Sequence, residues 1–422
     1  MGSLYLNKLM TQKLIYFFPH NPLPPRSGAH KRCLEILAGL RKLDLEVIFV
    51  SSILSSETSW DIDSISKLEQ DFVSRVCIYK PKFLDWKLLG LTSRFYRLTK
   101  TEVALDSVLR TPIRMRWWFA KILEEISPDI IIMSYCFWDS LLDRQKLQST
   151  ITVVDTIDLF TVNNQMNEAL KVHLPSVPIQ LDEVKETLLQ ENFFNKLSLD
   201  ASPEELQIFD RYDRTIAIAR NELEIIQKNT QHTSVSLLPM TQTPFYLENQ
   251  YTDPPIFTTG PNLFNTQGYL YFAKRVLPII LAEIPDFELQ VTGSCCQQVT
   301  PTPGIALLGF VPDLKLVYAR TKFLVCPVFG GTGQQVKIVE AMAHGLPVVA
   351  LAAAAKMSPI EHGINGFVAN NATEFAHYVI QLWQDPILCR QFGAAARSKI
   401  ANDFSEQCLL EGLKLILQPR SI

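Results

Sequence analysis

The sequence has no long uninterrupted apolar run and no marked bias in charge. Its longest strictly apolar stretch, LPVVALAAAA from Leu346, is about half of the ~20 residues that a membrane-spanning helix needs. The 40 Lys and Arg residues nearly balance the 43 Asp and Glu residues, which leaves a net charge of -3. Neither a membrane-spanning protein nor a dedicated nucleic-acid binder is indicated. With 422 residues, 47% of them hydrophobic, the chain is predicted to form two or three globular domains.

Cysteine pairing and zinc-binding spacing are also absent. The eight cysteines are spread thinly, except for the adjacent Cys295 and Cys296, and no Cys-x-x-Cys or Cys/His zinc spacing occurs. This pattern excludes a disulfide framework and predicts a reducing compartment. Near the start, an apolar run over 14–18 stops at Pro19, too early for the core of a signal peptide. We therefore expect a cytoplasmic protein.

Apolar runs alternate with helical patterns along the first half of the chain. The runs at 13–18 and 47–50 enclose a segment whose apolar residues recur at three- and four-residue spacing. Strand, helix and strand in about forty residues predict a βαβ unit in a parallel sheet. Residues 1–240 are thus predicted to form one Rossmann-like domain. Its further strands are expected at 73–79, 130–133, 151–155 and 215–219.

A change of composition separates this half from the next. Residues 239–255 read PMTQTPFYLENQYTDPP, with many turn formers and little periodicity, so 241–255 is interpreted as an interdomain linker. A second alternation of strands and helices over 256–403 predicts a second Rossmann-like domain, and a final helix within 404–422 is expected to pack back on the first. Two doubly wound α/β domains would hold a ligand in the cleft between them.

The densest chemical signal is the segment FGGTGQQVKIVEAMAHGLPVV, which begins at Phe329. A buried strand runs into three glycines, and a helix is expected to begin near Gln334. Glycines allow a ligand to approach the backbone closely, and a helix N-terminus offers free N–H groups to a phosphate. Lys337 and Glu340 on one helix face would place a cation beside a phosphate and a carboxylate beside sugar hydroxyls. The pattern indicates a nucleotide-sugar site, although the turn taken alone is more often structural.

Several stretches in order resemble one protein family. They are SGAHKRCLEILAGLRKLDLEVIFVS, FTTGPNLFNTQGYLYFAKRVLPIILAEIPDFELQVTG, LLGFVPDLKLVYARTKFLVCPV, GGTGQQVKIVEAMAHGLPVVA and HGINGFVANNATEFAHYVIQLWQD. Together they cover nearly the whole chain and resemble the retaining glycosyltransferases of family 4. The resemblance implies the GT-B fold, with two Rossmann-like domains facing a central cleft. It also implies transfer of a sugar from a nucleotide donor, with UDP favoured, to a hydroxyl of a polysaccharide, a lipid-linked acceptor or a small molecule.

The resemblance assigns a role to each matching position. Lys337 would contact the donor diphosphate and stabilise it as the sugar departs, and Glu340 would bind the nucleotide ribose. Gly28 would face the phosphates from the opposite wall, or would simply form a turn ahead of a helix. The loop whose backbone would meet sugar and phosphates comprises Gly330, Gly331, Thr332 and Gly333. Thr332 occupies the first position of the family's E-x7-E pair, so only Glu340 of that pair is present.

One departure from the family's pattern lies in the stretch VVDTIDL, residues 153–159. Relatives commonly carry a histidine near the reacting sugar at the position of Ile157, which cannot carry a proton. Asp155 and Asp158 remain at the strand end, where both are expected to point at the cleft. Asp158 would orient the acceptor or take its proton, or would instead cap the following turn. Asp155 is a further acceptor-side candidate.

A second departure is the absence of a basic residue early in the second domain. The matching segment, 260–265, reads GPNLFN, which leaves Asn262 to assist Lys337 with the phosphates. These losses keep open a catalytically silent subunit of the same fold that binds a nucleotide sugar or a partner enzyme. Asp61 and Asp63 match the D-x-D pattern of metal-dependent glycosyltransferases, but they lie outside the donor domain and are not expected to bind a metal. The resemblance to GT-B enzymes likewise implies that no metal is bound.

Two further features concern the acceptor side. His20 and His30 flank the loop after the first strand and are acceptor-side candidates. Residues 80–121 are rich in Lys, Arg and aromatic side chains. Such a surface could rest on an anionic membrane at the inner face and help to capture a lipid-linked acceptor. The alternative is a solvated helical hairpin whose aromatic side chains face the core or the cleft.

Overall fold

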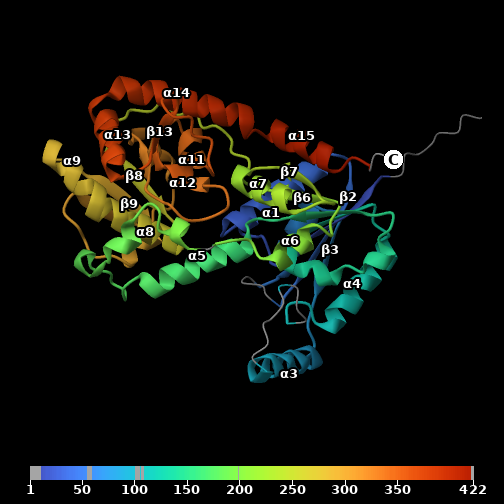
Figure 1. The fold of residues 1–422 in the computed structure, drawn as a ribbon. Helices are drawn as coiled ribbons and strands as arrows, with labels where there is room; N and C mark the ends of the chain where they lie inside the picture. Colours follow the sequence, from blue (N-terminus) through green and yellow to red (C-terminus); the bar gives the residue numbers. More distant parts are fainter. Residues whose placement is uncertain (1–10, 55–58, 100–104, 106–108, 198, 420–422) are drawn as a thin grey trace, which may run out of the picture.

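The computed structural model describes residues 11–54, 59–99, 105, 109–197 and 199–419, which form two α/β domains, each with a parallel sheet (Figure 1). The first sheet has the order β3-β2-β1-β4-β5-β6-β7 and the second has the order β10-β9-β8-β11-β12-β13. The strands of the first sheet are β1 (Lys13–Phe17), β2 (Glu46–Ser52), β3 (Arg75–Tyr79), β4 (Ile130–Ser134), β5 (Ile151–Asp155), β6 (Arg214–Ala217) and β7 (Ser234–Leu237). Those of the second are β8 (Ile256–Thr259), β9 (Leu289–Gly293), β10 (Ile305–Gly309), β11 (Leu324–Cys326), β12 (Val348–Leu351) and β13 (Gly366–Ala369).

Helices cover the sheets of both domains. Those of the first domain are α1 (Gly28–Arg41), α2 (Ile62–Asp71), α3 (Phe83–Thr99), α4 (Ile113–Ile126), α5 (Phe160–His173), α6 (Pro203–Phe209) and α7 (Arg220–Asn229). In the second half lie α8 (Leu263–Tyr271), α9 (Leu277–Glu283), α10 (Lys315–Arg320), α11 (Val336–Ala343), α12 (Ala352–Ala355), α13 (Ala372–Gln384), α14 (Pro386–Asp403) and α15 (Glu406–Ile416). A π-helical turn, Phe272–Val276, joins α8 to α9.

The sequence of β1 explains why its sheet is covered on both faces. Leu14 and Tyr16 pack into the core that contains residues of α1, whereas Ile15 and Phe17 pack into the core that contains residues of α4. Alternate side chains of a strand point to opposite faces, so an uninterrupted apolar run requires cover on both sides, as is typical of parallel sheets. The doubly wound architecture expected for both domains is confirmed.

The strand order of each sheet reverses at one place, between β1 and β4 in the first and between β8 and β11 in the second. Open α/β sheets bind ligands in the crevice at the carboxyl ends of the strands at such a reversal. Gly28 and Asn262 lie at the starts of the helices that follow β1 and β8, and the glycine loop of residues 330–333 follows β11. The topology therefore directs these sequence-predicted residues to the two crevices.

A stretch within 1–240 contributes to the core of the second domain. This stretch, residues 174–197, is called the strap here; it follows α5, which reaches toward α8 (Figure 1). Phe193 and Phe194 are buried in the second domain's core, and Gln267 of α8 donates a hydrogen bond to the carbonyl of Leu188, 3.0 Å away. The first domain as predicted therefore contains a segment that completes its neighbour's core.

The end of the chain returns to the first domain. Helix α14 runs along the second domain and α15 lies over the first (Figure 1), where Leu409 and Leu413 share a core with residues of α1. Gly39 permits this close packing, because a Cβ there would lie 2.7 Å from the Leu413 side chain. Among the described helices, none combines the length and apolar character needed to cross a membrane.

Candidate active site

The glycine loop after β11 meets the first domain directly. The hydroxyl of Thr332 donates a hydrogen bond to the carboxylate of Asp158, which follows β5. The N–H of Gly331 points at the sulfur of Met166 on α5, 3.3 Å away. Asp158 and Met166 of the first domain thus contact the loop that the sequence assigns to the donor, and Thr332 and Asp158, both predicted site residues, lie together.

Backbone geometry explains the glycines of this loop. A Cβ on Gly330 would overlap the rings of Phe264 and Phe194, and Gly331 has a φ of +109°, which side chains rarely adopt. Gly333 is less restricted, since a Cβ there would lie 3.6 Å from Asp158. Among the described residues, the backbone N–H groups of Thr332, Gly333 and Gln334 find no hydrogen-bond acceptor. Consecutive N–H donors without acceptors suit an anionic ligand.

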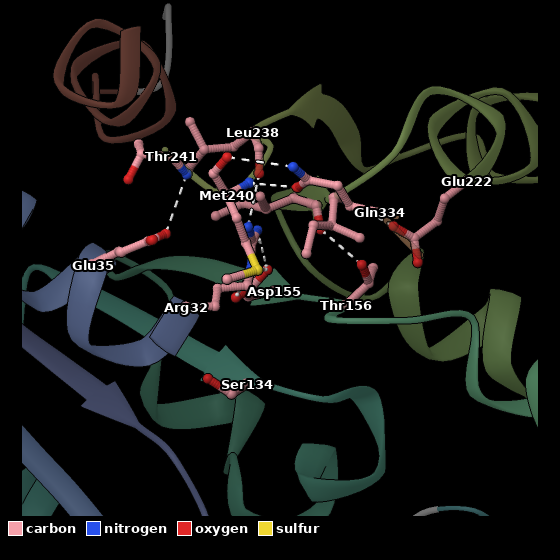
Figure 2. A network of polar contacts seen from close by, with 12 residues as sticks. Arg32, Glu35, Ser134, Asp155, Thr156, Glu222, Leu238, Met240, Thr241 and Gln334 are labelled. Carbon is pink, nitrogen blue, oxygen red and sulfur yellow. Dashed lines mark hydrogen bonds and ion pairs between the residues drawn. The ribbon is translucent and has the colours of Figure 1, made fainter. Parts of the chain in front are cut away.

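Helix α11 begins at Val336, two residues later than expected. Gln334 is held outside the helix by the residue just before the linker: its amide oxygen accepts a hydrogen bond from the N–H of Met240 at 2.7 Å (Figure 2). The linker is tied to the first domain as well, because the N–H of Thr241 donates to Glu35 of α1 at 3.2 Å (Figure 2). The start of the helix is therefore set by contacts distant in sequence.

Lys337, in the first turn of α11, reaches across the strand reversal to α8. Its ammonium group donates to the side-chain oxygen of Asn265 and lies 5.0 Å from the centre of the Phe257 ring. Burial lowers the pKa of Lys337. Asn262 is the N-cap of α8, and its oxygen accepts from the side-chain amide of Asn265 at 2.7 Å. Lys337 and Asn262 are thus joined through Asn265, which the sequence analysis did not single out.

Glu340 lies one turn further along α11 and is half-buried. Burial raises the pKa of its carboxyl group, and the charge of Lys31 lowers it. Within the described part of the chain its carboxylate has no hydrogen-bond donor. Lys31 is exposed on the first turn of α1, three residues after Gly28. A Cβ added to Gly28 would meet no atom within 4 Å. A carboxylate and a cation therefore interact across the cleft beside an open Gly28.

Asp158 is held in a constrained backbone. The preceding Ile157 has a φ of +62°, which is rare for a β-branched residue and is found chiefly at functional sites. The carboxylate of Asp158 accepts from the hydroxyl of Thr332 and from the amide of Asn163. Burial raises the pKa of Asp158 to about 7. Its carboxyl group can therefore take up or release a proton near neutral pH, which a general base requires.

Two buried carboxyl groups near Asp158 were not predicted from the sequence. Glu222, at the start of α7, has no exposed surface, and burial together with the charge of Asp158 raises its pKa to about 8. Glu205 of α6 accepts from the N–H groups of Phe160 and Thr161 at 2.8 and 3.1 Å. It thereby caps α5, a role that the sequence left open to Asp158. The position of Glu222 just after a predicted strand was a usable signal.

Asp155 is not open to the cleft. Its carboxylate is 0% exposed and accepts two hydrogen bonds from Arg32 of α1, at 2.8 Å from Nε and 2.6 Å from the second terminal nitrogen (Figure 2). Arg32 also donates to the carbonyl of Leu238 at 2.8 Å. The expectation that Asp155 faces an acceptor is corrected: the carboxylate neutralises a buried arginine that fixes the start of the linker.

The two candidate histidines lie together after β1. The rings of His20 and His30 have centres 6.2 Å apart, and both pack against Phe18. His30 is buried, and its Nδ1 accepts from the N–H of Arg26 at 3.3 Å. His20 is half-buried. These contacts make His30 part of the loop's packing.

A polar cavity of about 410 Å³ adjoins the glycine loop at Gly331. Its lining is rich in amide side chains, from the strap, α7 and the loop after β13, namely Asn192, Asn195, Asn221 and Asn370. The buried side-chain oxygen of Asn221 has no hydrogen-bond partner in the described part of the chain. Lys356 lines this cavity and two neighbouring ones of about 550 and 740 Å³. The described residues show no group of three or more His, Cys, Asp or Glu side chains placed to hold a metal ion.

Comparison with known proteins shows the fold and one similar domain. Residues 254–385 match the family model described as Glycosyl transferases group 1. The sucrose-phosphate synthase of Thermosynechococcus elongatus matches 96% of this chain and 98% of its own, with a TM-score of 0.61 and 14% identity. HepE of Anabaena, solved in complex with UDP and glucose, matches 96% and 99%, with a TM-score of 0.54 and 13% identity. The chain has the GT-B fold, and its residues 254–385 are similar to the group 1 glycosyltransferase domain.

Curated relatives match over shorter lengths. The poly(ribitol-phosphate) alpha-N-acetylglucosaminyltransferase of Staphylococcus aureus is 24% identical over 243 residues, which are 48% of this chain and 47% of that protein. An uncharacterized glycosyltransferase of Haemophilus influenzae is 27% identical over 167 residues, 37% of this chain and 47% of that protein. The chain thus spans about half the length of these relatives.

Proposed function

We propose that this protein is a retaining glycosyltransferase, similar to those of family 4, that takes its sugar from a nucleoside diphosphate donor. The observation that carries the proposal is the start of α11. There, backbone N–H groups that find no acceptor among the described residues, the Lys337 ammonium and the Glu340 carboxylate all belong to residues 332–340. Phosphate oxygens would accept from the N–H groups and from Lys337, while ribose hydroxyls would donate to Glu340.

Charge development explains how this arrangement would accelerate transfer. Negative charge grows on the diphosphate as the bond to the sugar breaks, and donors already aimed at that position stabilise it without reorganisation. Ile157 offers no proton acceptor beside the sugar. A donor phosphate oxygen would therefore take the acceptor proton on the same face, which leads to retention. Asp158, bonded to Thr332, would orient the acceptor hydroxyl or receive its proton.

The acceptor is proposed to enter by the polar cavity beside Gly331. Its asparagine side chains both donate and accept hydrogen bonds, as sugar hydroxyls do. UDP is the proposed nucleotide, in line with the family resemblance and with the UDP-bound HepE structure. We also propose that the reaction needs no metal and takes place in the cytoplasm. Residues 80–121 would bring the protein peripherally to an anionic inner membrane face.

One observation favours a second candidate, a catalytically silent subunit that binds a nucleotide sugar or a partner enzyme. Neither Ile157 nor the paired Asp155 can exchange a proton with substrate. Separate measurements of donor binding and donor hydrolysis discriminate the two candidates. Binding with turnover supports the transferase, whereas binding without turnover, with every acceptor class tried, supports the silent subunit.

The test of the site is a calorimetric titration with UDP, GDP and ADP. Glu340→Gln removes a charge-assisted hydrogen bond to the ribose, so we expect nucleotide binding to weaken by about 10- to 100-fold, corresponding to roughly 1.5–3 kcal/mol. Glu288→Gln, at an exposed position of the same domain, is the matched control and should bind as the wild type does. Equal affinity of the Glu340 variant and the control would remove Glu340 from the site.

A further inference from the structure

Helix α3 projects from the body of the first domain (Figure 1). Its one buried residue is Asp85, in the first turn. The Asp85 carboxylate accepts from the N–H of Lys82 at 2.6 Å and pairs with Arg114 of α4 at 3.5 Å. The start of the helix is therefore anchored by a buried carboxylate, while most of its length is not covered by the rest of the described structure.

The exposed side of α3 carries an apolar strip. At 100° per residue its five members fall within an arc of about 80°, and they are between 45% and 82% exposed. The strip consists of Leu84, Leu88, Leu91, Phe95 and Leu98. Phe83, Trp86 and Trp117 nearby are also more than half exposed. The alternative in which the aromatic side chains of 80–121 face the core or the cleft is thus wrong for these residues.

Charge decides what could cover this strip. Five cationic side chains over 80–99 are exposed, and Asp85, the acid of this stretch, is buried. None of the five forms an ion pair with a described residue; they are Lys80, Lys82, Lys87, Arg94 and Arg97. A second copy of α3 packed on the strip would bring like charges together without an exposed acid on either helix, which is unfavourable. A surface that is apolar inside and anionic outside matches both features.

We propose that α3 is a membrane-docking helix that lies in the interface of a bilayer containing anionic lipid. The strip of Leu84, Leu88, Leu91, Phe95 and Leu98 enters the acyl boundary, and Lys87 and Arg94, which border the strip, contact the lipid headgroups. Docking of this kind is independent of sugar transfer, and it holds or fails whether or not the site at α11 is active.

The experiment is co-sedimentation of the full chain with vesicles of phosphatidylcholine alone or mixed with phosphatidylglycerol. We expect binding only to the mixed vesicles and a steep loss in high salt. Lys87→Gln together with Arg94→Gln should weaken binding about 25-fold, since each cation near such a surface contributes about fivefold. Leu91→Asp with Phe95→Asp should abolish it. Ile387→Asp is the control, at an exposed isoleucine of α14 on the far side of the molecule (Figure 1).

All the substituted positions are exposed, so we expect the wild-type melting temperature in each variant. Three results would overturn the proposal. One is no binding to the mixed vesicles at low salt. Another is equal binding to both vesicle types, which charge would not explain. The third is a dimer in light scattering that Leu91→Asp dissociates, which would assign the strip to a second copy of the chain.

Discussion

Replacement of Asp158 by asparagine tests the electrostatics of the cleft. The carboxylate is buried between the domains, bonded to Thr332 and Asn163, and burial raises its pKa from 3.8 to about 7. Because the folded-state pKa lies above the unfolded-state pKa, the protonated form favours folding. That contribution is full below about pH 4 and is lost as the pH rises through about 7. The variant has no proton to lose, so its stability lacks this dependence.

The size of the effect follows from the pKa difference. A shift of about 3 units corresponds to on the order of 4 kcal/mol over the whole range, at about 1.4 kcal/mol per unit. Between pH 5 and pH 8, roughly 2–3 kcal/mol of this remains to be lost in the wild type. Asp158→Asn also removes the charge that helps to raise the pKa of Glu222. The variant should therefore gain stability relative to the wild type as the pH rises.

Urea unfolding at pH 5 and pH 8 measures this difference. Asp210→Asn is a control without pH dependence in this range: burial raises the pKa of Asp210, but hydrogen bonds from the His232 side chain and from the N–H groups of residues 231–233 outweigh burial and hold that pKa below its usual range. The wild type loses the Asp210 contribution only as the pH falls through the unfolded-state value of 3.8, so that variant should be less stable than the wild type by the same amount at pH 5 and at pH 8. If Asp158→Asn and the wild type lose the same free energy of unfolding between the two pH values, the Asp158 carboxyl group is not perturbed as argued.

Four further substitutions test the proposed donor site. Lys337→Ala should lower kcat by about 10²–10³ with a smaller change in donor affinity, because charge on the diphosphate grows during transfer. Lys337→Arg should recover part of the rate. Initial-rate kinetics measure both effects, and an alanine variant as fast as the wild type would exclude this role of Lys337. Gly330→Ala should lower the melting temperature and weaken donor binding because its Cβ overlaps the ring of Phe264, whereas Gly333→Ala, with only ordinary contacts, should retain the wild-type melting temperature.

The sequence was most informative where the residues of the proposed donor site are consecutive. The glycine loop, Lys337 and Glu340 follow one another in a single strand, turn and helix, so their chemistry could be predicted before their contacts were known. The strand alternation was sufficient for the two doubly wound domains, and the strand expected at 151–155 coincides with β5. Long stretches of local pattern are what sequence periodicity reports.

Pairings between distant residues could not be predicted. Asp155 and Asp158 look alike in the sequence, yet one neutralises Arg32, which is 123 positions away, and the other bonds to Thr332 across the domains. The apolar residues of the strap indicate burial but not which core receives them. Likewise, the leucines of α3 follow a helical spacing typical of a packed face, and only the three-dimensional arrangement shows that they are exposed.

The chain passes between its domains four times: out and back through the strap, across the linker, and back through α14 and α15. A gene divided at 241–255 would therefore not encode two self-sufficient halves. The upstream fragment would expose Phe193 and Phe194, whose partners lie downstream, and the downstream fragment would expose Leu413, whose partner α1 lies upstream. An exchange of either domain in this chain would have to include the strap and α15 together with the domains they complete.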